Sequence, residues 1–151
     1  MGKPWPVPEG VRVAPDGSWS VGEFRIVHAP SLRFLKERLV FEDGGAFLVQ
    51  GERRLPVVVE GPAFEVTELR LLPDTGEALA VLDDGSVEVL GPDSLATDAS
   101  TGRAECTARG GRARAAFSRG AHQALLEHVE EVGGRFFLRV GQRRLPIRAG
   151  A

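Results

Sequence analysis

The residues in this sequence that could do chemistry are three histidines, one cysteine and recurring pairs of arginines. His122 and His128 are six residues apart, and His28 lies far from both. Two metal ligands on one helix face are three or four residues apart, so this spacing does not favour a metal site. Cys106 is the only cysteine, which excludes an internal disulfide and a four-cysteine zinc site. We expect a buried, inert thiol at Cys106, and the sequence predicts neither a metal nor a cofactor.

Nucleophile and phosphate-binding motifs are missing from the sequence. It contains no Gly-x-Ser-x-Gly segment and no glycine-rich loop of the kind that binds nucleotides. A small hydrolase remains the alternative, with Glu60 acting together with His28 or His122 in a cleft between two halves of the chain, since clefts between repeats are natural ligand sites.

The arginine pairs Arg53-Arg54 and Arg143-Arg144 follow the same kind of glycine turn. Guanidinium groups on one face could bind an anion. The alternative, which we favour, is that they pair with local acids, because exposed ion pairs on strands are common and individually weak. The candidate anion-binding residues on this outward face are Arg54, Arg139, Arg144 and Arg148.

An internal repeat surrounds these arginines. Residues 47–56 read FLVQGERRLP and residues 137–146 read FLRVGQRRLP, an offset of 90. The same offset aligns Leu35 with Leu125 and Glu37 with Glu127. Each copy reads as hairpin–helix–hairpin, over residues 17–59 and 103–148. Such units usually pack about a pseudo-twofold axis, because each has an apolar face to bury.

The elements that position these residues follow from turns and periodicity. The first helix is expected to run from Pro30 to near Phe41, and the second to begin after Ser118 and to include Val129 and Val132 on its buried face. Glycine at the first turn position predicts two-residue hairpins. Pro56 and Pro146 indicate edge strands, or positions whose nitrogen points away from the ladder. The predicted core residues of the two final hairpins are Leu48, Leu55, Val57, Phe136, Leu138, Leu145 and Ile147.

The predicted fold class is α+β, with two hairpin–helix–hairpin repeats joined by a three-stranded β segment in a mostly antiparallel sheet. Residues 1–16 are expected to form an extended, proline-rich arm that Trp5 anchors to the body. Residues 17–90 are then a first unit with added strands, 91–102 a polar loop and 103–148 a second unit.

A family resemblance covers residues 17–147. Residues 16–22 read DGSWSVG; Ile26, a leucine-rich helix, residues 47–48 (FL) and 58–60 (VVE), and Phe64 follow, and residues 113–115 (ARA) lead into Arg119. This order resembles the bacterial family known as domain of unknown function 1285. The resemblance implies a repeated, two-part α+β fold and a suspected role in signal transduction, without catalytic residues to carry over. The sequence departs from the family pattern at residues 61–63 (GPA), which intervene before the phenylalanine. The positions that match the pattern are Trp19, Gly22, Glu60, Phe64 and Arg119.

Charge and hydropathy bear on the class of partner and on the location of the protein. The net charge is -2, which does not favour nucleic acid or an anionic membrane as a partner. No apolar run approaches the roughly 20 residues of a membrane-spanning helix, so the expected location is the cytoplasm. We expect a non-catalytic binding or regulatory module, self-associating as a homodimer, whose partner is a protein or a small-molecule anion. The candidate cleft residues are Trp19, Glu60, Arg119 and His122.

Overall fold

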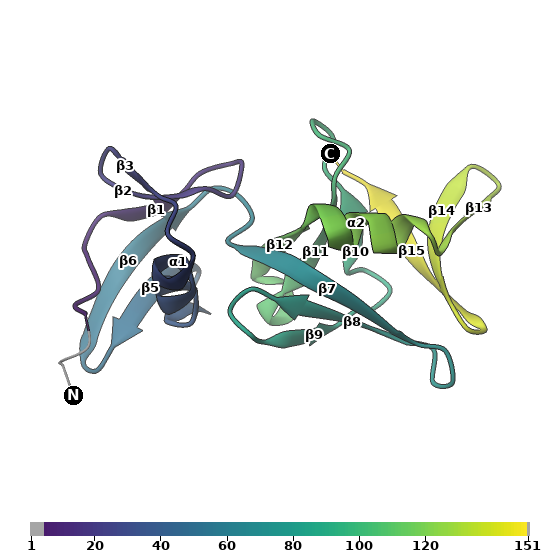
Figure 1. The fold of residues 1–151 in the computed structure, drawn as a ribbon, viewed down its shortest axis with the longest axis horizontal. Coiled ribbons are helices and arrows are strands. Elements are labelled where there is room, and N and C mark those ends of the chain that lie inside the picture. The colour runs from purple at the N-terminus through teal and green to yellow at the C-terminus, as the bar shows by residue number, and fades with distance from the viewer. Residues whose placement is uncertain (1–4, 151) are drawn as a thin grey trace. The chain divides into compact units, whose positions relative to one another are not determined.

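The structure is a computed structural model that describes residues 5–150 of the chain. The chain divides into two compact units, Met1–Ala63 and Phe64–Ala151. Both units are mostly β-sheet, and in the described residues each carries one α-helix (Figure 1). The division differs from the predicted one, because β7 (Phe64–Leu72), which was expected to extend the first unit, pairs with β12 (Ala113–Phe117) of the second.

The first unit is a six-stranded sheet in the order β3-β2-β1-β6-β5-β4. The pair β1·β6 is parallel, and the other pairs are antiparallel. The arm predicted over residues 1–16 contains strand β1, which lies inside the sheet between β2 and β6. The elements are β1 (Val11–Val13), β2 (Trp19–Val21), β3 (Phe24–Ile26), α1 (Ala29–Lys36), β4 (Leu39–Glu42), β5 (Gly45–Gln50) and β6 (Arg53–Val59).

The second unit is a nine-stranded sheet in the order β13-β14-β15-β10-β11-β12-β7-β8-β9. The pairs β10·β15 and β12·β7 are parallel. Helix α2 packs against β7 and β12. The remaining elements are β8 (Glu77–Leu82), β9 (Val87–Val89), β10 (Leu95–Thr97), β11 (Ala104–Ala108), the 3₁₀ turn η1 (Arg109–Gly111), α2 (Arg119–Leu126), β13 (Val129–Val132), β14 (Arg135–Val140) and β15 (Arg143–Ala149).

Six strands of each sheet follow one order, β4-β5-β6-β1-β2-β3 in the first and β13-β14-β15-β10-β11-β12 in the second. The bounds of α2, β13, β14 and β15 are those of α1, β4, β5 and β6 plus 90. The central pairs also correspond, since β1·β6 and β10·β15 are both parallel. The second sheet differs by the strands β7, β8 and β9, which extend it beyond β12.

Both helices are shorter than predicted. Helix α1 ends at Lys36 and α2 at Leu126, and in each case the chain continues as a strand. The amide of Arg38 donates to Leu35 O and the amide of His128 donates to Leu125 O, both at 3.0 Å, so the last turn tightens. Val129 and Val132 fit helical spacing as well as a strand, and β-branched residues favour the strand.

The predicted core is correct at four positions, because Leu48, Val57, Leu138 and Leu145 are all buried. Leu55 and Ile147 are half-buried. The prediction that Phe136 is a core residue is wrong, because Phe136 lies one residue from the start of β14 and is 48% exposed.

The two prolines do not mark edge strands. Strand β6 lies between β5 and β1, and β15 lies between β14 and β10. Pairing to the parallel neighbour begins only after each proline, with Arg12 opposite Val58 and Leu95 opposite Ile147. The ring nitrogen therefore points to the side where no ladder bond is formed, which is the other alternative drawn from the sequence.

Candidate functional site

The first unit carries an apolar groove. Its volume is about 620 Å³, within the range of about 300–1,000 Å³ that ligand sites occupy. Three segments contribute: the arm before β1, the end of β3 and the first two turns of α1. The lining residues are Trp5, Pro6, Pro8, Ile26, His28, Pro30, Ser31, Phe34 and Leu35.

The arm that forms one wall is held by Gln50 and Arg53, the residues that flank the turn between β5 and β6. The side chain of Gln50 accepts from the amide of Val7 at 2.9 Å and donates to Trp5 O at 2.7 Å. Arg53 donates to Val7 O at 3.0 Å. Val7 is fully buried, whereas Trp5 is 80% exposed. The anchor of the arm is therefore Val7, and the predicted anchoring role of Trp5 is wrong.

The polar side chains in the groove are His28 and Ser31. His28 is the N-cap position of α1 but makes no capping bond with its side chain. Its Nδ1 lies 2.8 Å from Ser31 Oγ. The groove thus combines an apolar body with one polar end, a pattern typical of ligand sites.

The four predicted anion-binding arginines contact local acids and carbonyls. In the first unit Arg54 binds Glu42 and lies over the ring of Phe47, 4.2 Å from its centroid. In the second unit Glu130 accepts from Arg139 at 3.3 Å and from Arg144 at 3.1 Å.

Burial alone would raise the pKa of Glu130, but the hydrogen bonds and charges of the two arginines outweigh it and lower that pKa. Arg148 donates to Asp93 O at 2.6 Å. These partners match the ion-pair alternative, and an anion site at the arginines stays a prediction.

The four predicted cleft residues fall on different units. Trp19 is buried in the first unit, where its Nε1 donates to Ala63 O at 3.0 Å, and Glu60 binds Arg12. In the second unit Arg119 is exposed, and Nδ1 of His122 accepts from the amide of Ala104 at 3.2 Å. Trp19 is thus a core residue.

A second hollow, of about 370 Å³, lies on the second unit. It is lined in part by His128 and Arg139. The Nε of Arg139 donates to Gly141 O at 2.7 Å, so this guanidinium is already fixed by Gly141 and Glu130. The other lining residues are Leu69, Leu71, Pro73, Ala124, Val140 and Gly141.

Cys106, the only cysteine, lies outside the groove. Cys106 is buried as predicted, and burial, followed by the charges of Glu88 and Glu105, raises the pKa of its thiol to about 12. Within residues 5–150 no group of three or more histidine, cysteine or acidic side chains is placed to hold a metal ion. Of the helices formed by these residues, neither has the length and hydropathy to cross a membrane.

Sequence reasoning missed most of the groove. Trp5 among Pro4, Pro6 and Pro8 was a signal that an aromatic and a rigid segment occur together. Ile26 and Phe34 gave no such signal, since only the folded sheet brings β3 and α1 to the arm.

The sequence matches no protein-family model, and no curated protein matches it. Solved structures are similar to most of the chain. A DUF1285 family protein from Silicibacter pomeroyi DSS-3 has a TM-score of 0.69 at 20% identity, covering 94% of this chain and 83% of its own. A DUF1285 family protein from Shewanella baltica OS155 has a TM-score of 0.58 at 10% identity, covering 79% of this chain and 91% of its own. The chain therefore has the DUF1285 fold, and the predicted resemblance is confirmed at the level of the fold.

Proposed function

We propose that this chain is a non-catalytic binding module and that the groove of the first unit is its ligand site. The observation that carries the proposal is the groove itself: about 620 Å³, apolar along most of its length and polar at His28 and Ser31. The wall formed by the arm is fixed by hydrogen bonds between the side chains of Gln50 and Arg53 and the backbone of Trp5 and Val7, so the site is largely preformed.

The predicted repeat is part of this proposal. The shared strand order and the constant offset of 90 support two copies of one unit, of which the first carries the groove. A regulatory role in signal transduction and self-association as a homodimer are further parts of the proposal that rest on the family resemblance.

The test is a titration with the apolar fluorophore 8-anilinonaphthalene-1-sulfonate. Trp5 is exposed in the groove and Trp19 is buried, so binding should quench and shift the emission of Trp5. The variant Phe34→Ser should abolish saturable binding, whereas Val89→Ser, which removes an exposed apolar side chain from β9 of the second unit, should leave it intact. Equal binding to both variants would place the fluorophore elsewhere and reject the proposed site.

A hydrolase is the second candidate function, and the contact between His28 and Ser31 favours it. A serine hydroxyl within hydrogen-bond reach of an imidazole is the first requirement for an activated nucleophile. The predicted pairings with Glu60 are less supported, because Glu60 binds Arg12 and the Nδ1 of His122 accepts from Ala104. Turnover of a short-chain nitrophenyl ester that is lost in both Ser31→Ala and His28→Ala would favour this candidate; turnover unchanged in these variants would reject it.

A further inference from the structure

The outermost strand of the shared six-strand order has a different neighbour in each unit. In the first unit β3 is the edge of the sheet. In the second unit the corresponding strand β12 is not an edge, because β7 pairs with it in parallel.

Register relates the two strands residue by residue. Arg25 pairs with Ser20, Ser20 with Arg12, and Arg12 with Val58. In the second unit Ala116 connects in the same way through Glu105 and Ala96 to Arg148, which is Val58 plus 90. Arg25 therefore occupies the place of Ala116. The flanking residues follow: Phe24 takes the place of Ala115, and Ile26 that of Phe117.

The side chains of β12 and β3 differ in exposure, because β12 has β7 as a neighbour and β3 is an edge. Ala115 and Phe117 are fully buried, and they lie opposite Phe64 and Val66 of β7. Phe24, at the place of Ala115, is 79% exposed.

The regions beside α2 and α1 differ in the same way. In the second unit β7 runs on past β12 and packs against α2, and the amide of Ser118 donates to Val66 O at 2.9 Å. In the first unit the corresponding region beside α1 is the open groove, lined by Ile26, Pro30 and Phe34 among others.

We propose that the free edge of β3 binds an extended segment of a partner polypeptide as an added parallel strand, whose further residues lie in the groove beside α1. The proposal rests on the proposed binding function and names its ligand class. Strand addition supplies affinity through main-chain hydrogen bonds and specificity through pockets for alternate side chains. The segment takes the place that β7 holds in the second unit.

The side-chain pattern of the segment follows from β7. Residues 64–66 read FEV: two apolar side chains flank an acid, and Glu65 lies opposite Ala116. In the first unit the residue at that place is the exposed Arg25. An acidic residue in the middle of an apolar pair would therefore lie beside a guanidinium. The partner segment is an apolar–acidic–apolar strand.

A second copy of this chain is a poorer occupant for a geometric reason. Pairing of β3 with its twofold-related copy would be antiparallel, whereas the neighbour of β12 is parallel. A twofold dimer through β3 would therefore not reproduce the parallel pairing that β12 makes with β7.

The hydrogen-bond pattern of β3 allows an outward donor to be removed without losing a hydrogen bond between β2 and β3. Val21 and Phe24 close a two-residue turn, so they form the hydrogen-bonded pair, and Ser20 and Arg25 the non-bonded one. The backbone N–H of Arg25 therefore points away from β2. The variant Arg25→Pro removes that donor together with the guanidinium, Phe24→Ser removes the exposed ring, and Arg25→Ala removes the guanidinium and its stem but keeps the donor.

The experiment measures fluorescence anisotropy of a labelled nine-residue peptide with the sequence of β7, FEVTELRLL, on the full chain. We expect saturable binding that Phe24→Ser and Arg25→Pro each weaken by about tenfold or more, and that Arg25→Ala weakens less. A control peptide with serine in place of its first and third residues should not bind. Photo-crosslinkers at the two peptide ends report the direction, and in a parallel strand the amino-terminal one labels the β2–β3 turn and the carboxy-terminal one labels α1.

Four results would overturn the proposal: no binding of the peptide, equal binding to Arg25→Pro, crosslinks in the reverse order, or a homodimer that Arg25→Pro dissociates. If the peptide fails while the apolar fluorophore still binds at Phe34, the groove remains a ligand site and only the strand addition is rejected. If both fail, the proposed function is rejected with it.

Discussion

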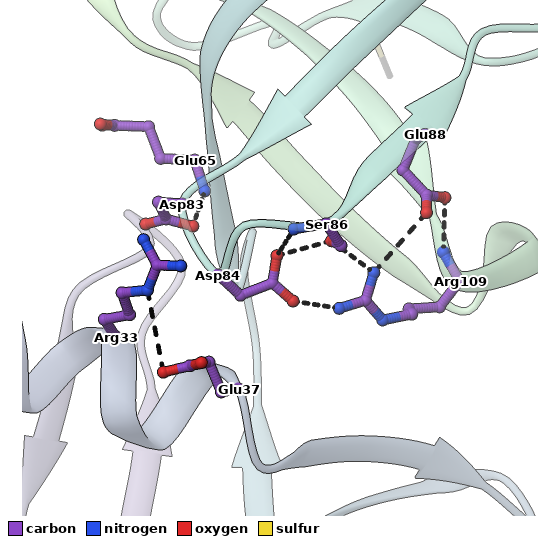
Figure 2. A network of polar contacts seen from close by, with 8 residues as sticks. All are labelled: Arg33, Glu37, Glu65, Asp83, Asp84, Ser86, Glu88 and Arg109. Atoms are coloured by element: carbon purple, nitrogen blue, oxygen red, sulfur yellow. Dashed lines mark hydrogen bonds and ion pairs between the residues drawn. The ribbon is translucent and has the colours of Figure 1, made fainter.

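Arg109 and Asp84 join two turns of the second unit. The guanidinium of Arg109, which follows β11, binds the carboxylate of Asp84 in the turn between β8 and β9 (Figure 2). The same guanidinium donates to Ser86 Oγ at 3.1 Å, and the amide of Arg109 donates to Glu88 at 2.9 Å. Arg109 has a φ of 52°, a left-handed conformation that a non-glycine residue keeps only where its surroundings fix it.

Replacing Arg109 by methionine should destabilise the second unit by about 2 kcal/mol. The side chain of Asp84 is only 6% exposed, so losing its partner leaves a nearly buried charge, while the backbone strain at position 109 is unchanged. Urea unfolding measures the loss. The matched control is Arg114→Met, whose partner Glu105 lies at 3.3 Å on a more exposed surface, and which should cost less than about 1 kcal/mol. Equal losses in the two variants would show that the pair of Arg109 and Asp84 stabilises the unit no more than the pair of Arg114 and Glu105 does.

Ionisation of Asp84 should contribute to the pH dependence of the unfolding free energy. Burial alone would raise its pKa, but hydrogen bonds from Ser86 and the charge and hydrogen bond of Arg109 lower it below the ordinary value of 3.8. The unfolded chain therefore binds the proton more tightly, so the stabilising contribution is present above the unfolded pKa and is lost as pH falls through the lower folded pKa.

The variant Asp84→Asn should be less stable than the parent at pH 6 and approach it below pH 4, roughly the ordinary range of an aspartate. Urea unfolding at a series of pH values measures this convergence. The control is Asp74→Asn, at an exposed position between β7 and β8, which should follow the parent curve. A constant difference between Asp84→Asn and the parent across the acid range would contradict the assignment.

The sequence predicts local geometry better than long-range assembly. A glycine-initiated two-residue turn fixes the register of a hairpin, and Leu48 does lie opposite Leu55, as Leu138 lies opposite Leu145. The helix ends were missed because valine at helical spacing also fits a strand. The pair of Arg109 and Asp84 joins residues 25 apart in sequence, and no local pattern relates them.

The groove could not be predicted for the same physical reason. It needs the arm to dock through Gln50, which is 43 residues from Val7, and it needs β3 to stay an edge. The shared strand order alone would predict that β3 and β12 have the same surroundings. Only the sheet order shows that β7 covers β12 and that β3 has no strand on its outer side within residues 5–150.

Gly51 and Gly141, 90 residues apart, offer a matched pair for testing how the surroundings of equivalent hairpin turns differ. Both have a φ of 60°, so alanine at either position meets the same left-handed strain of about 1–2 kcal/mol. An added Cβ at Gly51 meets open space, whereas at Gly141 it would lie 2.2 Å from Pro73 O. Gly141→Ala should therefore lose clearly more unfolding free energy than Gly51→Ala in denaturant titrations. Equal losses would mean that the turn containing Pro73 moves away from the added Cβ with no loss of unfolding free energy.

The two helices differ in how their first turns are capped. Ser118 caps α2, since its hydroxyl accepts from the amide of Ala121 at 3.2 Å, while His28 at the corresponding position of α1 makes no capping bond. Ser118→Ala should cost about 1 kcal/mol of unfolding free energy, and His28→Ala should change it by less than about 0.5 kcal/mol, as is usual for an exposed side chain. Denaturant titration of both variants decides the matter. If His28→Ala costs as much as Ser118→Ala, the contact between His28 and Ser31 stabilises α1 as a cap would, and its presence in the groove needs no ligand to explain it.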